Sequence, residues 1–182
     1  HRFGVSDRLK LSSKGRRPEL LVMTATPIPR TLSLSVYGHM DMSRLDEKPA
    51  GRKPPDTRTI SMDRIDSVID GVGRAIERNE RVYWVCPLVE ESDLSDLSAA
   101  EDRHRQLAAI YGADRVGLVH GRMNAQDKDA EAVRFRNGEI DILVATTVIE
   151  VGIDAPDAPI MIIEHAERFG LAQLHQLRAR VR

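Results

Sequence analysis

Between residues 60 and 178, short apolar runs alternate with helix-length segments, and this alternation constrains the fold more than any other feature. The runs expected to form strands are 81–87, 115–120, 140–145 and 160–164, and the segments expected to form helices are 65–76, 99–111, 124–136 and 171–178. Strands separated by helices of this length imply βαβ crossovers and a parallel sheet covered on both faces. The sequence therefore predicts an α/β fold.

Functional side chains of such sheets gather beyond the carboxyl ends of the strands. A further short apolar run at 19–23 also ends in a polar turn, so it is expected to be a strand. The residues at these ends are Thr26, Pro87, His120, Thr146 and Glu164. We expect the functional site along this edge.

A proline-rich stretch divides the chain. Residues 46–58 contain three prolines and a glycine among charged residues, which disfavours regular structure and places a linker near 48–60. Residues 1–60 carry a charge of +6, whereas 61–182 carry −7. The basic first third either contacts a polyanion or solvates surface loops, and charge alone does not separate these alternatives.

Several protein classes are excluded by composition. The single cysteine, Cys86, excludes an internal disulfide framework and a cysteine-based zinc site, and the histidines lack metal-ligand spacing. No apolar run approaches the roughly 20 residues of a membrane-spanning helix, and the N-terminus lacks a signal-peptide pattern. We expect a soluble cytoplasmic protein with no bound metal of its own and no membrane partner.

Four motifs carry candidate chemistry. The run 142–154 delivers Thr146 and Thr147 from an apolar strand and then Gly152 and Asp154. Hydroxyls and backbone N–H groups at a helix start can hold phosphate oxygens. The alternative is an ordinary strand with a threonine cap and a turn.

The other motifs are weaker on their own. The run 173–182 ends in alternating arginines, which fit either a solvated tail or an arginine finger that stabilises phosphoryl transfer. The run 24–30 forms a rigid polar turn, and the run 119–123 combines a glycine with a cation. The 182 residues contain no G-x-x-x-x-G-K-[ST] phosphate loop and no acidic pair in a context suited to Mg²⁺.

These motifs together resemble superfamily 2 DNA helicases of the RecG and Mfd type. TATPIPRTL at 24–32 resembles motif III, ILVATTVIEVGID at 142–154 motif V, and ERFGLAQLHQLRARVR at 167–182 motif VI. VYGHMDMSRLDEKPAGRKP at 36–54 and VCPLVEES at 85–92 are closer to the RecG type. The resemblance covers nearly the whole chain in the family's order.

The resemblance implies a RecA-like (P-loop NTPase-type) α/β fold. Residues 1–50 would be the end of a first motor domain and 61–182 most of a second, truncated at its end. His1 would end a family Asp-Glu-x-His motif, with the phosphate loop, the Mg²⁺-binding acids and a wedge domain upstream. The longer protein would use ATP and Mg²⁺ to remodel branched or duplex DNA, such as Holliday junctions and stalled forks, in recombination and repair. This chain alone would bind neither cofactor tightly and would lack ATPase activity.

The resemblance also implies residue roles. Thr24 and Thr26 would couple nucleotide state to DNA, and Gly152 and Asp154 would face the nucleotide. Gly121, Arg122, Thr146 and Thr147 would follow the nucleic-acid backbone. Gln176 and Arg180 would act in catalysis, with Arg182 a candidate second finger.

The sequence departs from the family pattern near its end. Ala179 replaces a glycine, and a second glycine before Arg182 is missing. Since alanine disfavours positive φ, we expect a distorted loop there. Two rivals remain: an Mfd-type transcription-repair translocase, and a non-catalytic nucleic-acid-binding module with a helicase-like fold.

The acidic stretch 90–102 holds six acids and no base. It would repel DNA, so we expect it to face away from the strand path.

Overall fold

The computed structural model describes residues 43, 55–87, 93–146 and 158–181, with the side chains of 93–97 left aside. The chain divides into two units, His1–Arg44 and Leu45–Arg182, and apart from Ser43 the described residues belong to the second. The expected strand at 19–23 lies outside them, so the first-domain remnant and the domain boundaries stay predictions.

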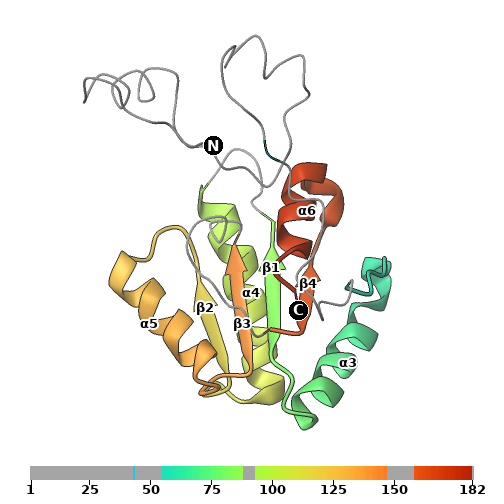
Figure 1. The fold of residues 1–182 in the computed structure, drawn as a ribbon. Helices are drawn as coiled ribbons and strands as arrows, with labels where there is room; N and C mark the ends of the chain where they lie inside the picture. The colour runs from blue at the N-terminus through green and yellow to red at the C-terminus, as the bar shows by residue number, and fades with distance from the viewer. Residues whose placement is uncertain (1–42, 44–54, 88–92, 147–157, 182) are drawn as a thin grey trace, which may run out of the picture. The chain divides into compact units, whose positions relative to one another are not determined.

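The described part of the second unit is built on a parallel sheet. Its strands are β1 (Val82–Cys86), β2 (Val116–Val119), β3 (Ile142–Thr146) and β4 (Ile160–Ile163), in the order β2-β3-β1-β4. Every pairing is parallel, and Figure 1 shows all the arrows pointing the same way. The predicted parallel α/β fold is confirmed, and each strand lies where the sequence placed it.

Helices cover both faces of this sheet. They are α3 (Ile65–Glu77), α4 (Asp93–Tyr111), α5 (Ala125–Arg136) and α6 (Leu171–Arg178), with short 3₁₀ helices at Met62–Arg64 and Ala166–Arg168. The prediction for α4 was wrong at its start, because a helix was expected from residue 99 and α4 begins at Asp93, within the acidic stretch. No proline or glycine interrupts residues 93–111, so nothing stops the helix from beginning there.

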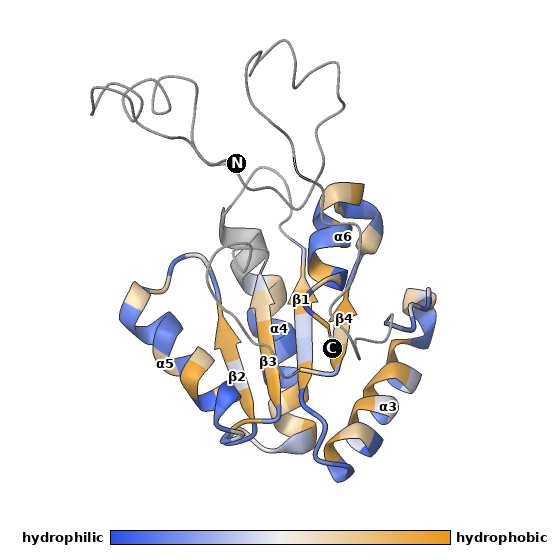
Figure 2. Cartoon of the chain, in the orientation of Figure 1, coloured by the Kyte–Doolittle hydropathy of each residue, from blue (hydrophilic) through white to orange (hydrophobic). Residues whose placement is uncertain are grey.

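The strand side chains alternate strictly between the two faces. Tyr83, Val85 and Leu143 pack with Phe135 of α5 and Leu177 of α6 in one buried cluster. Their sequence neighbours on the same strands pack with α3 and α4 in a second cluster, which includes Val82, Trp84, Ile142, Val144, Val72 and Leu107. Figure 2 shows the matching distribution, with apolar colour on the strands and on the sides of α3 and α5 that meet them. Two-sided burial explains why the strand sequences are almost continuously apolar.

The ends of α5 follow the sequence signals. The Asn124 side chain accepts a hydrogen bond from the Asp127 N–H at 2.8 Å, so Asn124 is the N-cap of the helix. Gly138 ends the helix at a φ of +74°, in the left-handed region that favours glycine. The Arg81 guanidinium donates to the carbonyls of Phe135 and Arg136 at 2.6 Å each, which ties the start of β1 to the end of α5.

Within the part of the chain that the structure describes, no helix is long and apolar enough to cross a membrane. Cys86, at the end of β1, is a buried free thiol.

The space that a Cβ would fill at position 117 of β2 is already occupied by the ends of neighbouring side chains. A Cβ there would lie 2.5 Å from Glu131 Oε2 and 2.5 Å from Ile140 Cδ1. We expect Gly117→Ala to lower the free energy of unfolding by about 1–3 kcal/mol, as overpacking of a tight core does. The measurement is a urea unfolding curve.

Gly71→Ala in α3 is the matched control. A Cβ at position 71 meets nothing closer than 3.6 Å, and helix propensity favours alanine by roughly 1 kcal/mol. The control should leave stability unchanged or raise it. Equal stability of the Gly117→Ala protein and the parent would contradict the close packing.

Candidate nucleic-acid and nucleotide site

The carboxyl ends of β2, β3 and β1 lie next to one another. Val119 is in register with Ala145, and Cys86 with Thr146. His120 therefore continues β2 beside Thr146, and the exposed Gly121 and Arg122 follow it. The structure thus brings three predicted site residues, Gly121, Arg122 and Thr146, to one edge of the sheet.

Thr146 contributes a buried hydroxyl at this edge. Its side chain is 2% exposed, and its Oγ1 has no hydrogen-bond partner among the residues that the structure describes. A buried hydroxyl without a partner is costly, so such groups call for an explanation. The position fits a group that bonds to an incoming ligand or to a neighbouring segment.

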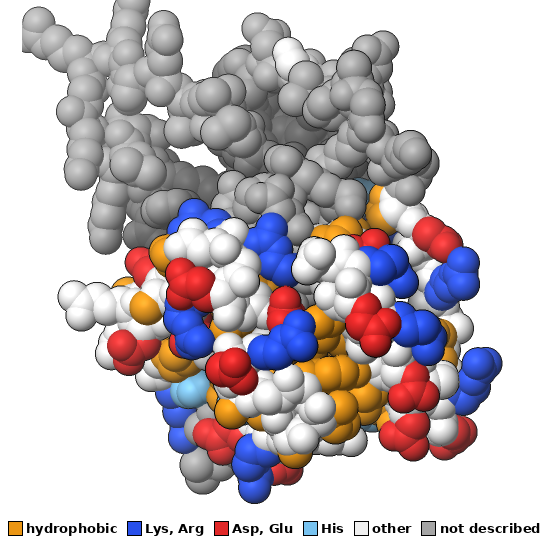
Figure 3. All heavy atoms as spheres, turned by 90° about the horizontal axis from the view of Figure 1, so that it is seen from below, with side chains coloured by type: hydrophobic (Ala, Val, Ile, Leu, Met, Phe, Trp, Pro, Cys, Tyr) orange, Lys and Arg blue, Asp and Glu red, His pale blue; other side chains and the backbone are white. Residues whose placement is uncertain are grey.

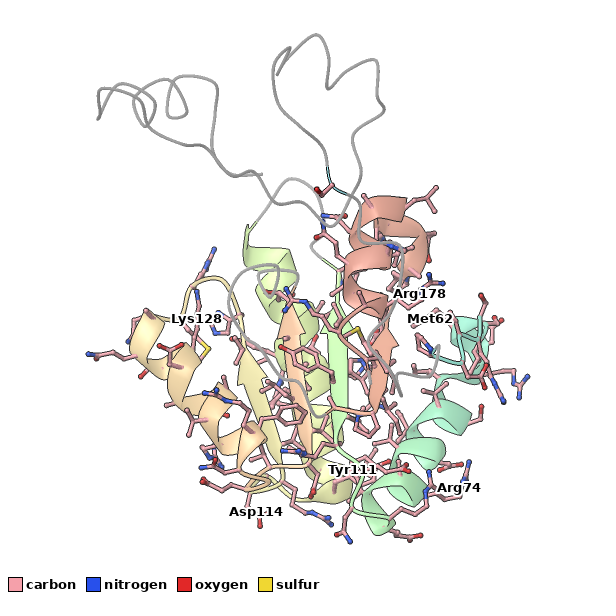
Figure 4. All side chains as sticks on the ribbon, in the orientation of Figure 1. Met62, Arg74, Tyr111, Asp114, Lys128 and Arg178 are labelled. Carbon is pink, nitrogen blue, oxygen red and sulfur yellow. The ribbon has the colours of Figure 1, made fainter. Side chains whose placement is uncertain are left out.

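Lys128 is a member of this site that the sequence analysis missed. Its ammonium donates to the Gly121 carbonyl at 3.0 Å, which ties the turn after β2 to the first turn of α5. In Figure 4 Lys128 lies near the start of α5, next to this turn. A signal was present, because helical side chains lean toward the N-terminus and Lys128 stands four residues after the cap Asn124.

His120 lies within the electrostatic influence of Lys128 and Arg122. Burial is the largest cause that lowers the pKa of His120, and the positive charges of Lys128 and Arg122 lower it further. Only Glu101 acts in the other direction. The imidazole is therefore neutral at pH 7, and the cationic character of the turn comes from Arg122 and Lys128.

One residue of the acidic stretch 90–102 influences this turn. Glu101, in α4, is close enough to raise the pKa of His120. Where the stretch as a whole faces relative to DNA stays a prediction.

Gln176 and Arg180 lie near β4, at the opposite outer strand from β2. Helix α6 stands beside the end of β4, the outer strand opposite β2 (Figure 1). Arg180 follows α6, and its N–H donates to the Leu177 carbonyl at 3.0 Å. The charge of Arg180 acts on the phenol of Tyr83, opposing the burial that raises the Tyr83 pKa. Gly121 and Arg122 therefore follow the outer strand β2 and Thr146 ends the central strand β3, whereas Gln176 and Arg180 belong to the segment after the other outer strand, β4.

Ala179 does not distort the chain. Its φ of −67° and ψ of −15° are right-handed helical values at the C-cap of α6. The expectation of strain was wrong at this position, because alanine strains the backbone only where φ is positive.

A buried ionic cluster closes the end of β4. The Glu164 carboxylate is 8% exposed and accepts from the Trp84 indole N–H and from Arg103, whose Nε and Nη2 lie 2.5 and 3.1 Å from its oxygens. The Arg103 guanidinium also lies over the Trp84 ring, 5.3 Å from its centroid. Sequence analysis placed Glu164 at a strand end but gave it no role and missed Arg103. The available signal was an acid that ends an apolar strand and must therefore find a partner.

The remaining predicted site residues, Thr24, Thr26, Thr147, Gly152, Asp154 and Arg182, lie outside the described residues, and their roles stay predictions. Over residues 55–87, 93–146 and 158–181, no group of three or more histidine, cysteine, aspartate or glutamate side chains could hold a metal ion.

Comparison with known proteins gives a consistent result. The family model for the helicase conserved C-terminal domain matches residues 62–182. The chain is 51% identical to the ATP-dependent DNA helicase RecG of Acidithiobacillus ferridurans over 181 residues, which is all of this chain and 26% of the relative. It is 48% identical to RecG of Bacillus subtilis (strain 168), where it covers 27% of the relative. The chain thus spans about a quarter of the length of these relatives.

A solved structure of RecG bound to a three-way DNA junction is also similar. The TM-score is 0.74 at 44% identity, over 92% of this chain and 22% of the solved one. This likeness and the family match confirm the predicted RecA-like fold of the second unit.

Burial of Cys86 predicts a loss of stability in alkali. Burial, with a smaller contribution from Glu164, raises the pKa of the Cys86 thiol to about 12. An unfolded thiol titrates near 8.5, so the folded state is disfavoured by about 1.4 kcal/mol per pH unit above roughly that pH, until the folded pKa is reached. Urea midpoints measured from pH 7.5 to 10.5 should fall, and Cys86→Ala should make the fall shallower. A midpoint that does not change up to pH 10 would contradict the burial of the thiol.

Proposed function

The chain belongs to the helicase conserved C-terminal domain family, and from this membership we propose that it is the second motor domain of a RecG-type ATP-dependent DNA helicase. The observation that carries the proposal is 51% identity to a RecG helicase over the whole chain. The structural likeness to a RecG protein bound to a three-way DNA junction supports it.

In this proposal the longer protein hydrolyses ATP between two RecA-like lobes and moves along duplex DNA. Its work is the remodelling of branched DNA, including Holliday junctions and stalled forks, in recombination and repair. Its partners are DNA and the wedge and first motor domains of the same chain, and it acts in the cytoplasm.

The turn after β2 holds the DNA backbone. Arg122 and Lys128 place two cations at this turn, and the Lys128 bond to the Gly121 carbonyl fixes its shape. Phosphate contacts of this kind position a protein on DNA without reading sequence. Thr146 and Thr147 extend the backbone path along the end of β3, and Thr24 and Thr26 couple it to the nucleotide state.

The side of the carboxyl edge next to β4 serves the nucleotide. Gln176 and Arg180 supply an amide and a guanidinium from α6, and Arg180 stabilises the charge that develops on the transferring phosphoryl group. Arg182 is a second candidate for this role, and Gly152 and Asp154 face the nucleotide. ATP, when bound, supplies by its hydrolysis the free energy for movement along DNA. The acids that hold Mg²⁺ lie in the first motor domain, upstream in the longer protein, as the resemblance to the helicase family implies.

The surface where the strands begin supports the placement of DNA at the carboxyl edge of the sheet. Figure 3 views the molecule from below, where the strands begin, and shows basic and acidic side chains interspersed around apolar area. Arg115 pairs with Asp141, and Arg78 with Glu80, at this end. Cations that are paired in this way attract phosphates weakly, which favours DNA binding at the carboxyl edge.

DNA affinity of the chain tests the turn. We expect Arg122→Gln and Lys128→Gln each to weaken binding to a fluorescein-labelled three-way junction, by a factor that is similar across DNA sequences. Each should lower the slope of log affinity against log salt by about 1, because one phosphate contact is lost. The measurement is fluorescence anisotropy over a series of salt concentrations.

Arg136→Gln is the control, because Arg136 is an exposed cation at the far end of the same helix. It should leave the salt slope unchanged. A loss of affinity as large as that of Arg122→Gln would mean that the effect is one of net charge, and the assignment of the turn would be wrong.

A chimaera tests the helicase assignment itself. The chain replaces the matching quarter of RecG from Bacillus subtilis, and DNA-stimulated ATP hydrolysis and junction unwinding are measured. We expect both activities, whereas the chain alone should hydrolyse no ATP because its 182 residues contain no phosphate loop. A folded chimaera that binds junctions without hydrolysing ATP would favour a non-catalytic binding module.

A further inference from the structure

We propose that Glu164 is a positioning residue: held by Arg103 and Trp84, it fixes the point at which the chain leaves β4 and thereby places α6 with Gln176 and Arg180. The kinetic consequence of this placement rests on the proposed function. The placement itself rests only on contacts within the sheet and its helices.

Glu164 is held through both its side chain and its backbone. Its carboxylate accepts three hydrogen bonds, two from Arg103 and one from Trp84. Its N–H donates to the Val85 carbonyl at 3.0 Å, which continues the pairing of β4 with β1. A forked guanidinium on a carboxylate fixes direction as well as distance, so Glu164 has a single orientation.

The contacts join three elements of the fold. Arg103 comes from α4 and Trp84 from β1, and both meet Glu164 at the end of β4. Trp84 belongs to the cluster under α3 and α4, whereas α6 packs on the opposite face through Leu177. Glu164 therefore connects the α4 side of the sheet to the segment that carries α6.

The segment after Glu164 is short and leaves little freedom. His165 has a φ of 47°, a left-handed value that costs energy for a residue other than glycine. Its carbonyl accepts from Arg168 at 2.9 Å, and the Gly170 N–H donates to the Gln173 side chain at 3.1 Å. Phe169 is buried in the cluster beneath α5 and α6. A change in direction at Glu164 therefore moves α6 as a unit.

Stability alone does not account for the ionic cluster. A buried ion pair contributes little net stability, because removing both charges from water costs about as much as their attraction returns. A packed apolar residue would serve the core equally well. What the charged pair adds is a fixed geometry at the turn that leads to α6.

Glu164→Gln tests the inference on the whole 182-residue chain. Glutamine has nearly the same shape and can still accept from Trp84, but it lacks the charge that holds Arg103. We expect amide hydrogen exchange over residues 165–178 to become at least about tenfold faster, while exchange in β2 and α5 stays within about twofold. Trp84 is the only tryptophan of the chain, so its emission should shift in this variant.

Asp141→Asn is the matched control. Asp141 forms a pair of the same length, 2.5 Å, with Arg115 at the start of the strands, far from α6. It should change neither the exchange of α6 nor the Trp84 emission. If Glu164→Gln does not fold, Arg103→Lys releases the fork from the other partner and should produce the same selective exchange.

The chimaera with RecG of Bacillus subtilis gives a second readout. Displacing Arg180 by about an ångström should lower kcat for ATP on the order of 10²-fold. The KM for ATP should stay within about twofold, because a finger acts in the transition state. Unchanged exchange over 165–178, or an unchanged kcat in an active chimaera, would overturn the inference. If the chimaera without substitutions hydrolyses no ATP, the proposed function fails, and the exchange experiment alone decides the positioning role.

Discussion

The strict alternation of strand side chains between two buried faces is the constraint on which the rest of the second unit depends. Each strand carries a side chain into the cluster under α5 and α6 and the next into the cluster under α3 and α4. A shift of one residue in register would exchange the two sets and bury the wrong groups. Because the register cannot slip, the strand ends are fixed to the residue, and the polar groups beyond them are fixed as well.

The alternation also explains how much the sequence could predict. The positions of the strands and of the helix over 124–136 follow from local patterns of a few residues. The start of α4 was expected at residue 99, although the charged residues before it do not prevent a helix and α4 begins at Asp93. Local patterns carry no information about partners distant in sequence, and so the contact of Arg103 with Glu164, 61 residues apart, was not predicted.

The candidate site was predicted in part for the same reason. Gly121, Arg122 and Thr146 follow strands that the pattern located, so their meeting at one edge followed from parallel topology. Lys128 joins them through a bond from a helix to a turn, which requires knowing how α5 begins. Gln176 and Arg180 follow the outer strand β4, whereas Gly121 and Arg122 follow the outer strand β2. The central strands connect the two groups, because Thr146 ends β3 and the charge of Arg180 acts on Tyr83 of the neighbouring β1.

The end of α6 shows why motif resemblance needs a structural test. The family pattern has glycine where this chain has Ala179, and the substitution suggested a strained loop. Instead Ala179 is the C-cap of α6 with right-handed helical φ and ψ, and its N–H donates to the His175 carbonyl at 3.1 Å. The Arg180 N–H then closes a turn on the Leu177 carbonyl at 3.0 Å, and the charge of Arg180 acts on the buried Tyr83. The end of α6 thus places Arg180 directly, and its position in turn depends on where α6 begins, which returns to the carboxylate of Glu164.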